Sequence, residues 1–320
     1  MNIFIMLPVY DDWESALEVC KRIDAVLEDH ASLNVSLMLI EDGSTSVVCP
    51  SEISWKPRFI ARLSVLVLQR NLGHQRAIAI GLAHLSQHGK ADALVIMDAD
   101  GEDRPEDIPA LLKAMLQGKR VVAVFAERGR RFEGFRFQLL YYCYRIVHRF
   151  VTGRDMRFGN FSALPWSYLD TLVAFPELWN HYAAAFLLTR LPYVRVRCNR
   201  AKRLRGKSRM NFAALVIHGL SALFANQELV GTRLLGTAMI TTVALITAIV
   251  GVAGVTLFTS LAIPGWATTT IGLLLILSGQ VLIAAFLLIF SIMMNRSHLG
   301  FLPIRDYSYF VRLETILYSR

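Results

Sequence analysis

Residues 93–103 read ALVIMDADGED, in which an apolar run is followed at once by four closely spaced acidic side chains. Other short apolar runs rich in β-branched residues recur through residues 1–126, where they alternate with helical patterns. The expected strands are 3–9, 35–40, 63–68, 93–97 and 121–125, and the expected helices are about 12–29, 72–87 and 106–118. Strands that alternate with helices predict an α/β fold with a mainly parallel sheet.

Polar residues follow four of the expected strands, at the ends where ligands bind in parallel sheets. These segments are 8–12 (PVYDD), 41–45 (EDGST), 70–73 (RNLG) and 98–103 (DADGED). Acidic groups gathered at one edge of a sheet repel one another unless a cation lies among them. A hard divalent cation binds carboxylates and bridges phosphate oxygens, so the pattern favours Mg²⁺ or Mn²⁺ with a diphosphate.

The second half of the chain carries a membrane pattern. The sequence is 54% hydrophobic, above the roughly 45–50% of soluble domains. Residues 234–295 contain no Asp, Glu, Lys, Arg or His. One spanning helix needs about 20 apolar residues, so two spans are expected, at about 236–259 and 269–293. Pro264 and Gly265 supply the break between them.

The charged flanks of the spans predict their orientation. Basic residues precede the first span and follow the second, whereas the linker 260–268 is uncharged; the basic residues are Lys202, Arg203, Arg205, Lys207, Arg209, Arg233, Arg296 and Arg305. Positive flanks stay in the cytosol, so we expect a multi-pass inner-membrane protein with both termini cytosolic. The N-terminus lacks the basic region of a signal peptide.

The net charge of +9 would suit nucleic acid, but its location indicates a membrane surface instead. The surplus lies in 128–154 and 195–209, just ahead of the spans, where anionic headgroups attract basic side chains. Nucleic-acid binding is therefore not expected. Residues 135–151 and 211–233 are expected as interfacial amphipathic helices, with packing on the soluble domain as the alternative for each.

With these motifs the chain resembles family 2 glycosyltransferases of GT-A fold, and more closely their polyprenyl-phosphate branch. That branch includes dolichol-phosphate mannose synthases and bacterial undecaprenyl-phosphate glucosyltransferases. The motifs that carry the resemblance are LPVYDD, IEDGSTS, QRNLGHQRAIAIGL, MDADGEDRPEDIPALL, VFAERGRR and RLRGKSRMNF. The resemblance implies a Rossmann-like nucleotide-sugar-binding domain (1–210, including an interfacial helix at about 135–151), a juxtamembrane helix (211–233), two transmembrane helices (234–295) and a cytosolic tail (296–320).

The resemblance also implies roles for individual residues. The residues expected to bind the nucleotide sugar are Pro8, Tyr10, Asp12, Ile40, Asp42, Asp98, Ala99 and Asp100. The metal ligands would be Asp98, Asp100 and Glu102, and the lipid-phosphate ligands Arg128, Arg203 and Arg209. Direct participation in catalysis is expected of Asp98, Asp100, Arg128 and Arg209.

Some positions depart from the family pattern. Asp12 and Glu102 replace the usual Glu and Gln, and Arg209 replaces a lysine while keeping the ability to hold phosphate. Asn160 stands where relatives have an aspartate proposed as base, and an amide cannot accept a proton at neutral pH. Either Asp155 or another group is the base, or none is needed. A phosphomonoester is largely ionised at neutral pH, so Asn160 favours a phosphate acceptor.

The expected activity is inverting sugar transfer from a nucleoside-diphosphate sugar to polyprenyl (undecaprenyl) phosphate, supplying a lipid-linked sugar for the cell envelope. A UDP-sugar is preferred and a GDP-sugar is possible. Two alternatives stay open: transfer to another membrane acceptor, such as a glycolipid or polysaccharide, and a non-catalytic homologue that acts as a membrane partner. The resemblance also implies a homo-oligomer, a tetramer in many relatives.

Overall fold

The computed structural model describes residues 1–30, 32–45, 53, 55–117, 120–128, 158–205, 227–259, 265–297 and 300–320. Three expectations lie outside these residues: the interfacial helix at 135–151, most of the helix at 211–233, and the side chains of Asp155 and Arg209. The chain divides into two units. The first holds the α/β domain together with residues 301–320, and the second holds the described residues 227–259, 265–297 and 300.

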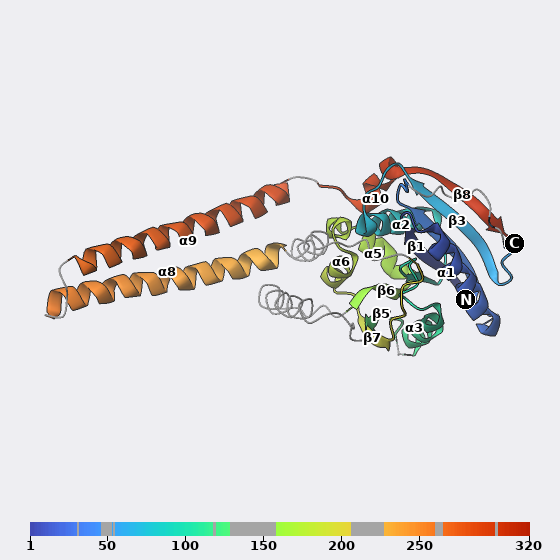
Figure 1. The fold of residues 1–320 in the computed structure, drawn as a ribbon, viewed down its shortest axis with the longest axis horizontal. Coiled ribbons are helices and arrows are strands. Elements are labelled where there is room, and N and C mark those ends of the chain that lie inside the picture. Colours follow the sequence, from blue (N-terminus) through green and yellow to red (C-terminus); the bar gives the residue numbers. More distant parts are fainter. Residues whose placement is uncertain are drawn as a thin grey trace. The chain divides into compact units, whose positions relative to one another are not determined.

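The first unit is built on one eight-stranded sheet with the order β7-β5-β6-β4-β1-β2-β3-β8 (Figure 1). The strands are β1 (Asn2–Val9), β2 (Asn34–Glu41), β3 (Ile60–Leu68), β4 (Ala93–Ile96), β5 (Ala123–Arg128), β6 (Phe158–Pro165), β7 (Tyr193–Cys198) and β8 (Val311–Ser319). Strands β4, β1, β2 and β3 run parallel, as expected. β6 runs antiparallel to β4 and β5, and β8 antiparallel to β3, so the sheet is mixed.

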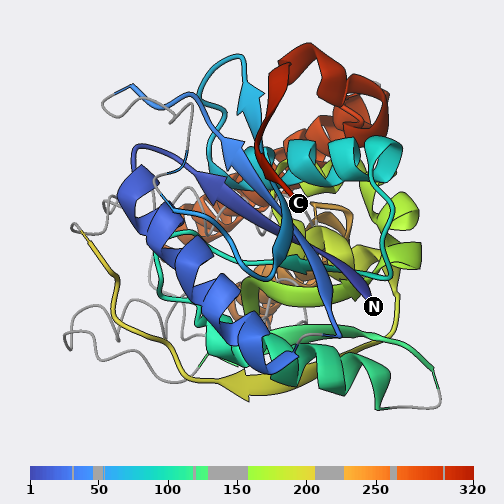
Figure 2. The same cartoon turned by 90° about the vertical axis from the view of Figure 1, so that its right-hand side faces the viewer.

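Helices cover both faces of the sheet, because successive strand residues point to opposite sides (Figure 2). On one face α1 (Trp13–Val26) and α3 (Ile108–Leu116) pack on residues such as Ile5 and Leu37. The other face holds α2 (His74–His88), α5 (Leu169–Val173) and α6 (Tyr182–Thr189). Short 3₁₀ turns complete this unit: η1 (Leu27–His30), η2 (Pro105–Asp107), η3 (Trp166–Tyr168), η4 (Pro176–Trp179) and η5 (Tyr307–Phe310).

The chain returns to the sheet at its C-terminal end. Residues Pro303–Asp306 form α10, which η5 and then β8 follow. The Trp179 ring lies 3.8 Å from the Phe301 ring, measured between centroids, and Glu314 of β8 accepts a hydrogen bond from Arg62 of β3 at 2.7 Å. The tail expected at 296–320 therefore contributes an edge strand to the α/β unit.

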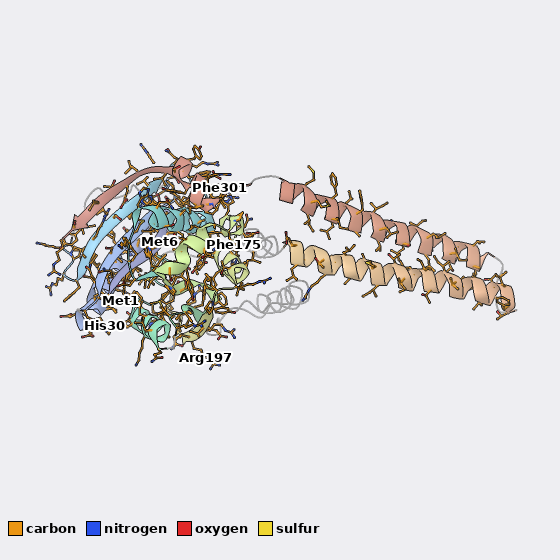
Figure 3. The ribbon with its side chains drawn as sticks, turned by 180° about the vertical axis from the view of Figure 1, so that it is seen from behind. Met1, Met6, His30, Phe175, Arg197 and Phe301 are labelled. Carbon is orange, nitrogen blue, oxygen red and sulfur yellow. The ribbon has the colours of Figure 1, made fainter. Side chains whose placement is uncertain are left out.

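The second unit contains two long helices, α8 (Gln227–Phe258) and α9 (Trp266–Ser297). Both are long and apolar enough to cross a membrane, over Glu228–Phe258 and Trp266–Met294. Their side chains point outward along both ribbons in Figure 3, and none of the most apolar stretch is buried. α8 begins earlier than the expected span at 236, so residues 227–233 belong to this helix and not to a separate juxtamembrane one.

Candidate active site

The parallel strands β4, β1, β2 and β3 end at one edge of the sheet, which brings together the loops after residues 9, 41, 68 and 96. In the loop after β4, Asp103 Oδ2 accepts the Asp98 N–H at 3.1 Å and Asp100 Oδ1 accepts the Glu102 N–H at 2.9 Å. Gly101 has a φ of 81°, a region that favours glycine. These bonds hold Asp98 and Asp100 at the edge, both partly exposed.

Residues 199–205 run beside this loop and form a second wall of the site. The backbone N–H groups of Ala201 and Leu204 donate to the carbonyls of Glu102 and Asp100 at 2.9 and 3.0 Å. The Leu204 side chain lies over Gly101, where an added Cβ would come within 2.5 Å of Leu204 Cγ. Glycine is therefore required there both for its φ and for this close contact.

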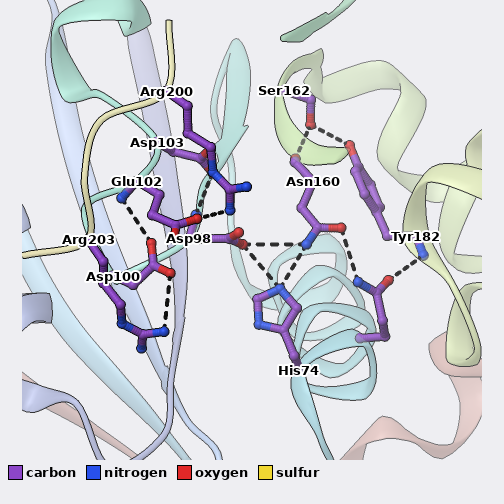
Figure 4. Close-up of polar contacts among 11 residues, drawn as sticks. His74, Asp98, Asp100, Glu102, Asp103, Asn160, Ser162, Tyr182, Arg200 and Arg203 are labelled. Atoms are coloured by element: carbon purple, nitrogen blue, oxygen red, sulfur yellow. Dashed lines mark hydrogen bonds and ion pairs between the residues drawn. The ribbon is translucent and has the colours of Figure 1, made fainter. Parts of the chain in front are cut away.

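Arg203 lies between acidic groups from two strand ends, and Figure 4 shows its contact with one of them, Asp100. Its Nη2 atom is 3.0 Å from Asp12 Oδ2, and its Nη1 atom is 3.8 Å from Asp100 Oδ2. The sequence predicts a lipid-phosphate contact for Arg203. In the structure the guanidinium offsets part of the negative charge of the acidic edge.

Glu102 is held by Arg200 in an ion pair, with both side chains largely shielded from solvent. Burial lowers the pKa of the Arg200 guanidinium, against the raising effect of Asp100 and Asp98. Within the described part of the chain, no three His, Cys, Asp or Glu side chains are arranged to hold a metal. The predicted ligand set of Asp98, Asp100 and Glu102 is therefore not assembled, because Arg200 pairs with the third carboxylate.

Asp98 contacts the start of α2 and the strand β6. Its Oδ1 atom is 3.1 Å from His74 Nε2 and 3.4 Å from Asn160 Nδ2. The Asn160 side chain is buried, with its Nδ2 atom 2.8 Å from His74 Nε2. Gln75 Nε2 donates to Asn160 Oδ1 at 3.1 Å. Asn160 thus belongs to a hydrogen-bonded network beside Asp98. A carboxylate at this position could not donate as the Asn160 amide does, so it would change these bonds.

Asp42 holds the loop that precedes α2. Its two carboxylate oxygens accept the backbone N–H groups of Leu72 and Gly73 at 2.7 and 2.9 Å. Burial raises the pKa of Asp42 to about 6, and these two hydrogen bonds oppose that rise. Ile40 lies in the core beneath α2, next to Gly81. The Asp42 side chain therefore holds a loop in place and the Ile40 side chain packs in the core. Both residues are predicted to line the nucleotide pocket.

The raised pKa of Asp42 predicts a pH dependence of stability. The folded protein binds a proton more tightly here than the unfolded chain does, so the Asp42 contribution to the free energy of unfolding increases as the pH falls through 6. Between pH 7 and 5 the gain is about 1 kcal/mol. Thermal unfolding of wild type and Asp42→Asn at both values tests this. The variant should lack the gain, and an equal pH response of the two proteins would contradict the assignment.

Loops from the first two strands are tied together at the same edge. Asp11 has a φ of 50° and its N–H donates to Ser44 Oγ at 2.8 Å. Asp11 Oδ1 accepts the Thr45 N–H at 2.8 Å. Tyr10, 37% exposed, follows the buried Pro8 and faces solvent beside this junction. Ala99 is buried between the two aspartates of the β4 loop.

Glu41 belongs to the acidic segment 41–45 after the second expected strand, but the sequence predicts no site role for it. It is the last residue of β2 and only 3% exposed. Its Oε1 atom accepts the Ser44 N–H, but its Oε2 atom has no hydrogen-bond partner among the described residues. A buried acceptor without a donor is costly. Its one sequence signal is an acidic residue closing an apolar strand.

Two predicted cations are described only in part or not at all. Arg128 closes β5, and its side chain lies outside the described residues. Arg209 lies outside them entirely. The described edge therefore combines the carboxylates of Asp12, Asp98 and Asp100 with the guanidinium of Arg203, while the Arg200 guanidinium pairs with Glu102. Mg²⁺ and Mn²⁺ fit such a site, because Mg²⁺ is commonly held by one or two carboxylates plus substrate phosphates.

Comparison with known proteins gives a family match for the α/β unit. Residues 4–168, more than half of the chain, match the sequence model of the family described as glycosyl transferase family 2. An undecaprenyl-phosphate 4-deoxy-4-formamido-L-arabinose transferase of Erwinia tasmaniensis is 30% identical over 172 residues, covering 54% of this chain and 50% of its own. The same enzyme of Edwardsiella ictaluri is 32% identical over 127 residues, covering 39% and 37%. The chain thus spans half or less of these relatives.

The solved structures that resemble this chain have lower sequence identity to it than these relatives do. Glucosyl-3-phosphoglycerate synthase from Mycobacterium tuberculosis, in complex with Mn²⁺ and UDP-glucose, has a TM-score of 0.46 and 17% identity, covering 72% of this chain and 80% of its own. A mannosyltransferase from Pyrobaculum calidifontis, in complex with GDP-mannose and Mn²⁺, has a TM-score of 0.42 and 15% identity, covering 89% and 86%.

Proposed function

The chain belongs to glycosyl transferase family 2, and from that premise we propose that it transfers a sugar from a nucleoside-diphosphate sugar to polyprenyl phosphate. The observation that carries the proposal is the acidic edge: Asp12 and Asp100 come from two strand ends and share Arg203, and Asp98 lies two residues before Asp100 in the same loop. A carboxylate-rich edge with a guanidinium suits a diphosphate held through a divalent cation.

Asp98 and Asp100 would hold Mg²⁺ or Mn²⁺ together with diphosphate oxygens. When bound, such an ion offsets the negative charge that develops on the departing nucleoside diphosphate. Arg203 is proposed to neutralise the same phosphates, giving up its present contact with Asp100. Arg128 and Arg209 are proposed to join it and to bind the acceptor phosphate.

The nucleobase is proposed to lie against the β1 and β2 ends. There the Tyr10 ring is exposed and Pro8 stiffens the strand end. We propose a UDP-sugar as donor, with a GDP-sugar as the competing choice that nucleotide binding decides.

The acceptor is inferred from the amide that stands at Asn160, at the point of the described site where relatives carry a proposed base. Asn160 is engaged as an amide with His74, Gln75 and Asp98, and an amide is no base. A sugar hydroxyl would need a base to become a nucleophile, whereas a phosphomonoester is already largely ionised at neutral pH. Positioning and charge neutralisation then suffice for attack on the anomeric carbon with inversion.

The setting of the reaction is proposed from the apolar helices and the basic residues. α8 and α9 would anchor the protein in the inner membrane, with residues 1–210 and both termini in the cytosol. The relatives act, by their names, on undecaprenyl phosphate, which suits an acceptor at that membrane face. A homo-oligomer, with four copies as in many relatives, is part of the same proposal.

The test is product formation by the full chain in detergent or nanodiscs. A radiolabelled UDP-sugar, undecaprenyl phosphate and Mn²⁺ should give a chloroform-soluble labelled lipid that mild acid cleaves, as expected for a sugar phosphodiester. An acid-stable labelled lipid would indicate another acceptor. Nucleotide binding with no product across UDP- and GDP-sugars would indicate a non-catalytic homologue and overturn the proposal.

A further inference from the structure

A chain of hydrogen bonds runs from the backbone of α6 to the carboxylate of Asp98. The N–H of Tyr182, the first residue of α6, donates to Gln75 Oε1 at 2.7 Å. On the other side of the same amide, Gln75 Nε2 donates to Asn160 Oδ1 at 3.1 Å. Asn160 Nδ2 donates to Asp98 Oδ1 at 3.4 Å and lies 2.8 Å from His74 Nε2 (Figure 4). The chain therefore joins α6, α2, β6 and the loop after β4.

The direction of this chain is fixed by its first donor. A backbone N–H can only donate, so the Gln75 oxygen faces Tyr182 and the Gln75 NH₂ group faces Asn160. The Asn160 oxygen in turn faces Gln75, which leaves its NH₂ group on the side of Asp98. Turning either amide over would place two donors, or two acceptors, against each other. The hydrogen-bond pattern therefore assigns both amide orientations.

The Asn160 NH₂ group bridges two acceptors. The 2.8 Å contact between Asn160 Nδ2 and His74 Nε2 is a hydrogen bond only if the ring nitrogen accepts, so the ring proton is on Nδ1. Asp98 Oδ1 lies 3.1 Å from the same ring nitrogen and is an acceptor too. Each of these two atoms receives a hydrogen of the Asn160 amide. An oxygen in place of this NH₂ group would repel the Asp98 carboxylate.

The chain is shielded from solvent around Asn160. Asn160 is 8% exposed, and Ser162 and Tyr182 are fully buried. Ser162 Oγ donates to the backbone carbonyl of Asn160 at 2.9 Å and lies 2.7 Å from Tyr182 Oη. A polar group that loses its partner in such surroundings is costly, because water does not readily replace the partner. A change of one donor to an acceptor in this chain should therefore alter the contacts of Asp98.

We propose that Gln75 and Asn160 are positioning residues for Asp98: Gln75 sets the direction of the Asn160 amide, and Asn160 presents a donor that holds the Asp98 carboxylate in place for the divalent cation. The amide at position 160 is then the side chain that this chain of hydrogen bonds requires. The inference rests on the proposed function for the cation at Asp98 and goes beyond it by giving Gln75 a role. Loss of a partner that orients a metal ligand typically weakens metal affinity or activity roughly 10- to 100-fold.

The test is calorimetry of Mn²⁺ and UDP binding to the full chain in detergent, together with initial rates at varied Mn²⁺. Gln75→Glu keeps an oxygen for the Tyr182 N–H but replaces the donor that faces Asn160. The Asn160 amide should turn over and present its oxygen to Asp98, so Mn²⁺ with UDP should bind about 10- to 100-fold more weakly. Because Asp98 itself is still present, a high Mn²⁺ concentration should restore most of kcat, which it would not do for a misfolded protein.

Asn160→Asp changes the second amide of the chain in the same way. It keeps an oxygen for Gln75 Nε2 and places another oxygen against Asp98. We expect a similar loss of Mn²⁺ and UDP affinity and a rate below that of wild type. A carboxylate that served as a base would raise the rate instead. A faster Asn160→Asp enzyme, or wild-type Mn²⁺ and UDP affinity in either variant, overturns the proposal.

Gln69→Glu is the matched control, because it adds the same charge directly after β3, at the same edge of the sheet. Gln69 is exposed and donates a 3.4 Å bond to the Val311 carbonyl. This variant should bind Mn²⁺ and UDP within about twofold of wild type. An equal loss in Gln69→Glu and Gln75→Glu would show that the added charge alone weakens binding, which also overturns the proposal.

Two further measurements separate the possible causes of a loss. Thermal unfolding of each variant detects misfolding, and Gln75→Met, which removes the donor without adding a charge, should show a smaller loss of affinity of the same kind. Weaker Mn²⁺ and UDP binding in Gln75→Glu and Asn160→Asp, with no lipid product from wild type, would support the positioning role and refute the proposed transfer. A wild-type protein that binds neither UDP nor GDP with Mn²⁺ would refute both.

Discussion

Asp100→Asn is expected to lower kcat/KM for lipid-linked sugar formation about 10³-fold, while the protein stays folded. Asparagine keeps a carbonyl oxygen that can accept the Glu102 N–H, so the turn after β4 is preserved. What it removes is the negative charge that faces Arg203 and the proposed cation. Initial rates with varied UDP-sugar and Mn²⁺ measure the effect, and most of the loss should fall in kcat.

The matched control for this substitution is Asp92→Asn. Asp92 precedes the same strand, β4, at its opposite end, where it accepts the Asn2 N–H at 2.7 Å. Loss of that exposed bond should leave kcat/KM within about twofold of wild type. A similar drop in both variants would mean that charge at the carboxyl end of β4 has no special part in the reaction.

Arg203→Ala is expected to lower kcat/KM about 10²-fold and to weaken UDP binding, since it leaves Asp12 and Asp100 without their shared guanidinium. The added repulsion acts on any phosphate that enters the edge. Calorimetry of UDP with Mn²⁺ and steady-state kinetics separate the binding loss from the catalytic loss. Arg203→Lys should recover only part of the activity, because an ammonium cannot span both carboxylates as a guanidinium does.

Arg205→Ala serves as the control for Arg203. Arg205 belongs to the same segment and pairs with Glu14, but both side chains are more than 60% exposed. Exposed ion pairs contribute little, so this variant should match wild type in UDP affinity. Equal losses in the two variants would show that positive charge along residues 199–205 acts generally and that the position of Arg203 is unimportant.

The parallel half of the fold was predictable because its signals are local. Each of the strands β1 to β5 coincides with an apolar run, and each helix between them follows a polar loop. The strand β6 reads FGNFSALP, and its Gly, Asn and Pro interrupt the apolar run that would predict a strand. It forms because it pairs with β4 on one side and with β5 on the other. The strand β7 reads YVRVRC, and its apolar and basic residues alternate clearly. From the sequence, its arginines are instead predicted to contact lipid headgroups.

The sequence predicts which strand ends form the site, but it does not predict which side chains pair with one another there. Sequence order alone places Asp12, Asp98 and Asp100 at one edge. It cannot show that Arg200 pairs with Glu102, because that contact joins distant segments. For the same reason, the role of Asn160 depends on the Tyr182 N–H, which sets the direction of its amide through Gln75.

The most direct measurement is anomalous X-ray scattering from crystals of the full chain grown with Mn²⁺ and UDP. The account predicts one strong Mn²⁺ peak within bonding distance of Asp98 or Asp100, with the UDP diphosphate on its open side and Arg203 beside it. A Mn²⁺ peak that touches neither aspartate, or a diphosphate bound away from the β1, β2 and β4 ends, would contradict it.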